Sequence, residues 1–185
     1  MGLVLLTGGA RSGKSQLAVA LATRQPAPVV VVATAEAGDD EMAARIHRHR
    51  QARPVSWTTV EEPLDLAGAL DRVPAESFLL IDCLSLWVAN LMGRELPDEQ
   101  ILQRARDVAA LVAARPTGAV AVTNEVGSAI VPDNRVARRY RDVLGTVNAD
   151  WAAASTRAAL VVAGRLLPLS HPDDIWTEDP GWIPS

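Results

Sequence analysis

The stretch that most restricts how this chain can fold is the octapeptide Gly8–Ser15, GGARSGKS. It follows the short apolar run Leu3–Leu6, and apolar residues at helical spacing come after it over Ser15–Arg24. A fully apolar run that stops at glycines is typical of a buried parallel strand. The octapeptide matches the pattern G-x-x-x-x-G-K-[ST], in which backbone N–H groups and a helix N-terminus face phosphate oxygens. Residues 3–24 therefore predict a strand, a phosphate-binding loop and a helix.

Each position of this loop has a chemical reason. Gly8 and Gly13 let the backbone turn and approach phosphates closely, Lys14 can bridge the β- and γ-phosphates, and the Ser15 hydroxyl can join the shell of a Mg²⁺ ion. The chain has 17 Arg and a single Lys, Lys14. Since Lys is a compact point charge and Arg a planar fork, this favours a functional loop over an incidental glycine turn. The predicted phosphate-binding residues are Gly8, Gly9, Ala10, Arg11, Ser12, Gly13, Lys14 and Ser15.

Strand patterns and helix patterns alternate along the rest of the chain. We expect strands at 29–33, 56–60, 78–83, 119–123 and 159–163, and helices at 39–51, 63–70, 84–92, 97–114 and from 133 or 134 to beyond Trp151. Such alternation predicts the α/β class, with a mostly parallel sheet covered by helices on both faces. We expect one domain over residues 1–169, followed by a tail at 170–185 that is rich in Pro, Trp and acidic residues.

Composition excludes several classes of protein. With 49% apolar and 22% charged residues the chain is globular. The apolar runs are too short for a membrane span, and no signal peptide is expected. A net charge of −4 argues against a general nucleic-acid binder. Cys83 is the only cysteine, which is consistent with a reducing cytoplasm.

Polar residues end two of the expected strands. Asp82 follows the apolar run 78–81, and a carboxylate at the carboxyl end of a buried strand faces the ligand crevice of a parallel sheet. It can hold Mg²⁺ through water, or cap the helix that follows. Asn124 and Glu125 end a later strand, where they can orient a substrate hydroxyl or a water, or serve a turn.

Two of the three histidines lie on the expected helix 39–51. His47 and His49 are about 200° apart around such a helix, so at most one is expected to face a nucleotide. Arginines surround His49, which disfavours its imidazolium form and leaves a neutral ring able to act as a nucleophile. The same arginines can bind a triphosphate, or the segment is only a solvated basic helix end.

Several stretches together resemble one known family, the bifunctional adenosylcobinamide kinase / adenosylcobinamide-phosphate guanylyltransferases. These stretches are TGGARSGKS, DDEMAARI, RPVSWTTVEEP, LLIDCLSLWVANL and VTNEVGSAIVPDNRVARRYRDVLGTVN. The resemblance covers about residues 1–165. It implies a P-loop NTPase fold similar to RecA and a homotrimer. The composition, described above, predicts a cytoplasmic protein with no nucleic acid or membrane partner.

The resemblance also implies two reactions. ATP or GTP phosphorylates adenosylcobinamide; then a histidine takes GMP from GTP, with Mg²⁺ as cofactor, and passes it to adenosylcobinamide phosphate, giving adenosylcobinamide-GDP. It implies Lys14 and His49 as catalytic residues and Ser15 and Asp82 as metal ligands. The further nucleotide-binding residues are Thr34, Ala35, Glu36, Arg50, Gln51, Ala52, Arg53, Glu61 and Asp82. We expect the helix that carries His49 to move toward the loop when GTP binds.

Two other readings of the residues stay open at this point. One is a monofunctional P-loop kinase for a small molecule, in which the histidine helix only binds substrate. The other is a nucleotide-binding module of the RecA type without catalysis.

Overall fold

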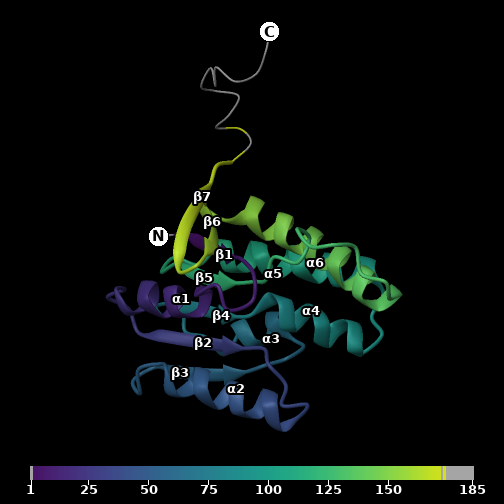
Figure 1. Ribbon diagram of the computed structural model, residues 1–185. Coiled ribbons are helices and arrows are strands. Elements are labelled where there is room, and N and C mark those ends of the chain that lie inside the picture. Colours follow the sequence, from purple (N-terminus) through teal and green to yellow (C-terminus); the bar gives the residue numbers. More distant parts are fainter. Residues whose placement is uncertain (1, 172, 174–185) are drawn as a thin grey trace.

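The computed structural model describes residues 2–171 and 173 and contains one sheet of seven strands (Figure 1). The strand order is β3-β2-β4-β5-β1-β6-β7, and all neighbours are parallel except β6 and β7. The strands are β1 (Leu3–Thr7), β2 (Val29–Ala33), β3 (Thr58–Glu61), β4 (Phe78–Asp82), β5 (Ala119–Val122), β6 (Arg157–Val162) and β7 (Arg165–Leu169). Because six strands run in the same direction, their carboxyl ends share one edge of the sheet.

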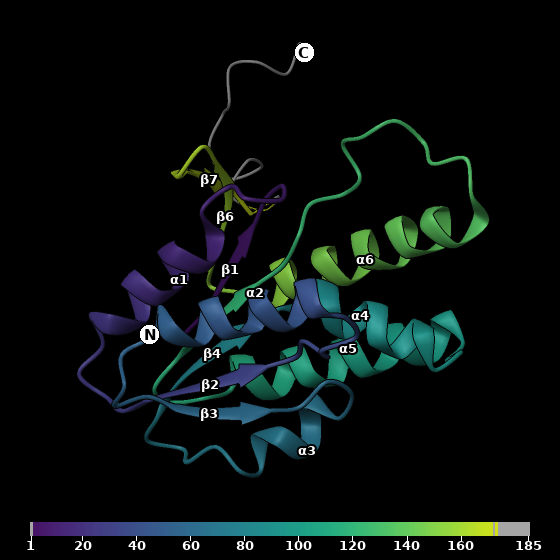
Figure 2. The ribbon, with the colours of Figure 1, turned by 60° about the horizontal axis from the view of Figure 1, so that its bottom comes forward.

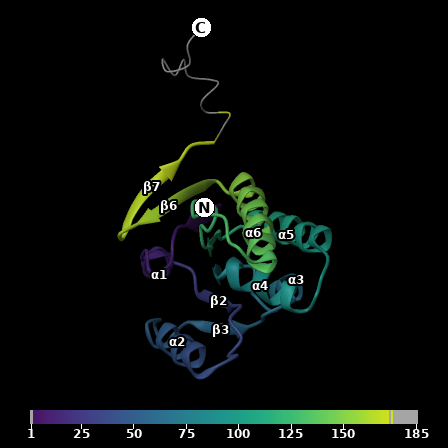
Figure 3. The same cartoon turned by 45° about the vertical axis from the view of Figure 1, so that its right-hand side comes forward.

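Helices cover both faces of this sheet. They are α1 (Lys14–Thr23), α2 (Asp40–Gln51), α3 (Leu66–Leu70), α4 (Leu84–Gly93), α5 (Asp98–Ala113) and α6 (Arg135–Ala154). Figures 2 and 3 show α1 and α2 on one side and α3 to α6 on the other, with the β6–β7 hairpin at one end of the sheet. The prediction of a mostly parallel sheet with helices on both faces is confirmed.

The core has two layers because strand side chains alternate between the faces. Leu3 and Leu5 of β1 point into the larger layer, which contains the fully buried Trp87 and Trp151. Val4 and Leu6 point into the smaller layer, where Ala18 and Ala22 of α1 close it. Small side chains on α1 bring that helix, and the loop before it, close to the sheet.

Most expected elements occur within one or two residues of their expected ends. Asp39 caps α2 by accepting a hydrogen bond from the Met42 N–H at 2.7 Å, and Asn134 caps α6 in the same way. The short helix begins at Leu66 rather than Pro63, because Asp65 is its N-cap.

Two outer elements differ from expectation. β7 was not among the expected strands, and it pairs with β6 at the end of the sheet. The apolar residues Met42, Ala43 and Ile46 suit an inner face of the helix expected over 39–51. Met42 and Ile46 are half-buried, but Ala43 is exposed and α2 has no fully buried residue. Most of the expected tail, 170–185, lies outside the described residues.

Among the described residues, none of the helices is both long and apolar enough to cross a bilayer.

Candidate nucleotide site

The loop after β1 has the backbone that its sequence requires. Gly8 has φ +151°, and a Cβ there would lie 2.3 Å from the Val161 carbonyl oxygen of β6. Gly13 has φ +101° and precedes α1 as its N-cap. Arg11 adopts a left-handed conformation at φ +57° and is exposed. The two glycines of the pattern therefore stand where a side chain would be strained or would clash.

Backbone hydrogen bonds fix this loop to its neighbours. The Glu125 N–H donates to the Gly8 carbonyl at 3.0 Å, which ties the loop to the end of β5. The Gly164 N–H, in the turn between β6 and β7, donates to the Ser12 carbonyl at 2.8 Å. The sequence did not predict this hairpin contact, since β7 was not expected.

Lys14 is folded into the loop. Its Nζ donates to the carbonyls of Gly8 and Gly9, both at 2.7 Å, and lies 3.4 Å from the Ser12 hydroxyl. The residue is 7% exposed, and this burial lowers the pKa of Lys14, while the charge of Asp82 acts in the opposite direction. An ammonium so held inside a ring of backbone groups is placed to receive phosphate oxygens.

Asp82 joins the end of β4 to α2 and to the residues just after that helix. It ends β4, and its Oδ2 accepts a hydrogen bond from Arg53 Nη2 at 3.0 Å and lies 3.4 Å from His49 Nδ1. The Asp82 side chain is 11% exposed and that of Arg53 8%. Burial raises the pKa of Asp82, but the His49 hydrogen bond and the Arg53 charge outweigh it and hold that pKa below its ordinary value.

The structure distinguishes the two histidines of α2. His49 is half-buried and faces Asp82, whereas His47 is exposed. From the sequence, only arginines were expected near His49. The fold also brings the Asp82 carboxylate to it. No local pattern signals this contact, because the two residues are 33 positions apart and meet only through the sheet order.

The other expected nucleotide-binding residues differ in burial and in the partners that their side chains contact. Thr34 is fully buried, and its hydroxyl donates to the Cys83 carbonyl at 2.7 Å and accepts from the Cys83 N–H, so it serves the fold. Glu36 pairs with Arg94 at 2.9 Å, and Arg50 pairs with Glu61 at 3.5 Å. Ala35 is half-buried, and Gln51 and Ala52 are exposed.

Residues that the sequence did not single out support this edge from behind. Asn90 donates to the carbonyls of Thr34 and Pro63, and the Tyr140 hydroxyl donates to the Ser85 carbonyl at 3.1 Å. Burial raises the pKa of Tyr140 to about 12, so it stays a neutral hydrogen-bond donor. Polar residues on helices gave no sequence signal for these contacts.

Oxygen donors suited to Mg²⁺ are present at this edge. Ser15 offers a half-buried hydroxyl at the start of α1, and Asp82 offers its Oδ1, which takes no hydrogen bond within the described part of the chain. Among the described residues there is no group of three or more His, Cys, Asp or Glu that could hold a metal. Mg²⁺ in nucleotide sites takes one or two protein ligands and completes its shell with water and phosphate oxygens.

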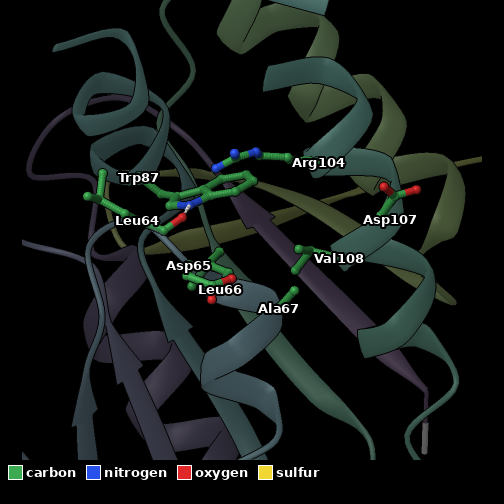
Figure 4. Close-up of a pocket in the computed structure, with 8 residues that line it drawn as sticks. All are labelled: Leu64, Asp65, Leu66, Ala67, Trp87, Arg104, Asp107 and Val108. Atoms are coloured by element: carbon green, nitrogen blue, oxygen red, sulfur yellow. Dashed lines mark hydrogen bonds between the residues drawn. The ribbon is translucent and has the colours of Figure 1, made fainter. Parts of the chain in front are cut away.

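A separate cavity of about 460 Å³ lies on the other face of the sheet, between α3, α4 and α5 (Figure 4). Trp87, Arg104 and Asp107 line it, and the Trp87 N–H donates to the Leu64 carbonyl at 2.9 Å. None of the expected nucleotide-binding residues lines this cavity.

A phosphate loop between a buried strand and a helix, at the carboxyl edge of a parallel sheet, defines a P-loop NTPase fold. Solved structures agree with this class. A KaiC-like protein, PH0186, from Pyrococcus horikoshii is 18% identical with a TM-score of 0.52, covering 86% of this chain and 70% of that one. Protein PH0250 from the same organism is 11% identical with a TM-score of 0.53, covering 94% and 89%.

Sequence comparison places the chain within this class. Residues 4–169 match the family described as cobinamide kinase / cobinamide phosphate guanyltransferase. The bifunctional adenosylcobalamin biosynthesis protein CobU of Escherichia coli K12 is 44% identical over 176 residues, 88% of this chain and 96% of that protein. CobP of Pseudomonas aeruginosa is 42% identical over 167 residues, covering 89% and 95%. The chain belongs to the cobinamide kinase / cobinamide phosphate guanyltransferase family.

Proposed function

We propose that this protein phosphorylates adenosylcobinamide with ATP or GTP and then transfers GMP from GTP, through a guanylylated histidine, to adenosylcobinamide phosphate. The product is adenosylcobinamide-GDP. The single observation that carries this proposal is the position of His49, whose Nδ1 lies 3.4 Å from Asp82 Oδ2 at the carboxyl edge of the sheet, where the phosphate loop also begins. Family membership supports two activities rather than one kinase activity or binding without catalysis.

In the kinase step the residues of the loop hold and neutralise the triphosphate. The backbone N–H groups of 8–15 and the ammonium of Lys14 face the β- and γ-phosphates, since phosphoryl transfer depends on positioning and charge stabilisation. Asn124 and Glu125 follow β5, and the Glu125 N–H donates to the Gly8 carbonyl of this loop. In the proposed kinase step their side chains orient the acceptor hydroxyl. Glu125 also accepts hydrogen bonds from the backbone of Gly127 and Ser128, which shapes the loop after β5.

In the guanylyl step the same loop holds GTP, and His49 attacks its α-phosphorus. Pyrophosphate leaves, and GMP stays on the imidazole until the phosphate of the acceptor takes it. His47 is exposed two residues away and does not share the contact with Asp82. We therefore assign the nucleophile to His49.

The metal ligands proposed for both steps are Ser15 and Asp82. Mg²⁺, when bound, neutralises charge on the phosphate oxygens of the nucleotide. The proposed nucleotide-binding edge is completed by Glu61 at the end of β3, Arg50 near the end of α2, Arg53 just after that helix, and the segment Thr34–Glu36 after β2. Thr34 acts there through the backbone that it holds.

We further propose that the chain works as a homotrimer in the cytoplasm, without nucleic-acid or membrane partners. Support for assembly comes from exposed apolar side chains in two separate places. Ile130, Val131 and Val136 are 94%, 57% and 71% exposed in and after the loop that follows β5, and Leu166 and Leu167 of β7 are 53% and 57% exposed. Exposed apolar patches of this kind mark interaction surfaces.

The proposal is tested with Mg²⁺ and α-labelled GTP. Acid-labile, base-stable label on the protein, together with phosphorylation of adenosylcobinamide, is the expected result. Phosphorylation without protein label would indicate a monofunctional kinase, and bound nucleotide with neither activity would indicate a binding module. Repeating the kinase assay with ATP and with GTP identifies the preferred donor.

A further inference from the structure

Asp82 contacts His49 through the ring nitrogen Nδ1. The distance to Oδ2 is 3.4 Å, and the same oxygen accepts the Arg53 hydrogen bond at 3.0 Å. Because Arg53 is 8% exposed and Asp82 11%, this carboxylate has one fixed orientation and little access to water. A neutral imidazole carries a proton on only one of its two ring nitrogens. The nitrogen that donates a hydrogen bond keeps this proton, so the other nitrogen keeps a free lone pair.

We propose that Asp82 is a positioning residue for His49: it accepts the Nδ1–H, so that Nε2 keeps its lone pair and is the atom that takes the guanylyl group. This inference rests on the proposed function and deepens it. Arg53 holds the carboxylate in place from the segment that follows α2, and the three side chains form one unit that fixes the ring, as carboxylates do for histidines in other nucleophilic sites.

The step balances without an added proton donor or acceptor. Nε2 donates its lone pair to the α-phosphorus, the bond from that phosphorus to the bridging oxygen breaks, and pyrophosphate leaves with the electron pair. The ring then carries the guanylyl group on Nε2 and its proton on Nδ1, and Asp82 faces the resulting positive charge. In the second half a phosphate oxygen of the acceptor attacks, and the electrons of the Nε2–P bond return to the ring.

Positioning of His49 by Asp82 and binding of Mg²⁺ by Asp82 affect different reactions. A ligand to Mg²⁺ serves both reactions, because both need the metal-bound triphosphate. A residue that fixes the tautomer of His49 serves guanylyl transfer alone. The carboxylate can do both, since the contacts to His49 and Arg53 use Oδ2 and leave Oδ1.

The first test reads the tautomer directly in the full-length wild-type protein. Long-range ¹H–¹⁵N correlation of ¹⁵N-histidine-labelled protein is recorded at pH 8.5, where an ordinary imidazole is neutral. The His47→Gln variant, altered at the exposed neighbour, distinguishes the signals of the two rings on α2. We expect the His49 proton on Nδ1; a proton on Nε2 would overturn the proposal.

The second test compares rates in Asp82→Asn, whose amide cannot replace the carboxylate. We expect the single-turnover guanylylation rate at saturating GTP to fall by about 10²-fold more than the kinase rate, the upper end of the loss when a partner that orients a histidine ligand is removed. Equal losses in the two rates overturn the role of Asp82. If the variant does not fold, the wild-type tautomer decides. Absence of any protein-bound guanylyl group in the wild type rejects the proposed function instead.

Discussion

The phosphate loop and α2 lie on the same side of the sheet (Figure 2). They differ in the number and kind of contacts that hold them to it. The loop is tied by backbone hydrogen bonds to β5 and to the β6–β7 turn, and α1 behind it buries Ala18 and Ala22. α2 buries no residue. The contacts of its carboxyl end with the edge of the sheet include the His49–Asp82 and Arg50–Glu61 pairs, and Arg53 follows just after it.

This difference corresponds to the two proposed reactions. Both need a triphosphate held in a fixed position, which the loop supplies. Only guanylyl transfer needs a nucleophile that reaches the α-phosphorus and later passes the guanylyl group to a second substrate. A helix held by a few polar contacts suits this role, because it can move. The expected movement of α2 on GTP binding stays a prediction, and His49 already contacts Asp82 in the described conformation.

The largest expected effect comes from a variant that loses the nucleophile on α2 and leaves the phosphate loop intact. His49→Ala should abolish protein guanylylation, because no nucleophile remains, and should spare kinase turnover. The matched control is His47→Ala, which alters the exposed ring two residues away and should retain both activities. The measurement is label from α-labelled GTP together with phosphorylation of adenosylcobinamide. Equal loss of both activities in His49→Ala would mean that α2 serves folding or nucleotide binding instead.

A change in the loop should impair both reactions. Lys14→Ala should lower each rate by about 10³-fold, because a preorganised positive charge on the phosphates is lost in both transition states. Lys14→Arg tests the requirement for a compact ammonium, since a planar guanidinium does not fit between the carbonyls of Gly8 and Gly9. We expect Lys14→Arg to fail as well. Selective loss of one reaction would contradict a shared triphosphate site.

Two arginine variants measure how much the polar contacts at the end of α2 contribute to the free energy of unfolding. Arg53→Gln should destabilise the protein by about 3 kcal/mol, because it leaves the buried Asp82 carboxylate without its charged partner. Arg50→Gln breaks an exposed pair, with side chains 68% and 64% exposed, and should cost about 0.5 kcal/mol or less. Urea unfolding of each variant gives the two values.

The pH dependence provides a control for this comparison. The pKa of Asp82 is lowered by folding, so its contribution to stability is present above the ordinary value of 3.8 and is lost as the pH falls through the lowered pKa. The stability difference between wild type and Arg53→Gln should therefore be constant near neutral pH and shrink in acid. A difference that does not shrink would argue against the Arg53–Asp82 pair as its source.

The last prediction concerns the backbone of the phosphate loop. Gly8→Ala should destabilise the protein by about 2 kcal/mol, because φ is +151° and the new Cβ would meet the Val161 carbonyl. Gly9→Ala is the matched control, since no atom lies within 4 Å of a Cβ at that position and its φ is not in the left-handed range. Equal stabilities in thermal unfolding would show that the loop is less fixed than described.

The parts of the molecule that local sequence determines were predictable. The apolar runs of β1, β2 and β4 and the pattern at 8–15 are signals within a few residues of one another, and the structure has them where they were expected. β7 was missed because Pro168 and the exposed leucines around it lack the alternation of a half-buried strand. Its partner β6 and the turn at Ala163–Gly164 become evident only when the hairpin is formed.

The site was predicted as separate residues and not as a unit. His49 and Asp82 were each singled out, one as a nucleophile and one as a metal ligand, but their contact depends on how the fold brings the end of α2 to the end of β4. The same is true of Thr34, whose hydroxyl holds the backbone of Cys83, a contact that the sequence did not indicate. Sequence patterns identify reactive side chains, whereas long-range packing decides which of them meet.

The most direct test of the central claim, that the loop and His49 act on one GTP molecule, is a crystal structure with Mg²⁺ and the non-reactive analogue α,β-methylene-GTP. We predict that the triphosphate lies on the backbone amides of residues 8–15. We also predict that Nε2 of His49 lies about 3–3.5 Å from the α-phosphorus, in line with the departing pyrophosphate. A structure in which the nucleotide fills the loop while His49 lies out of reach of the α-phosphorus would contradict the account.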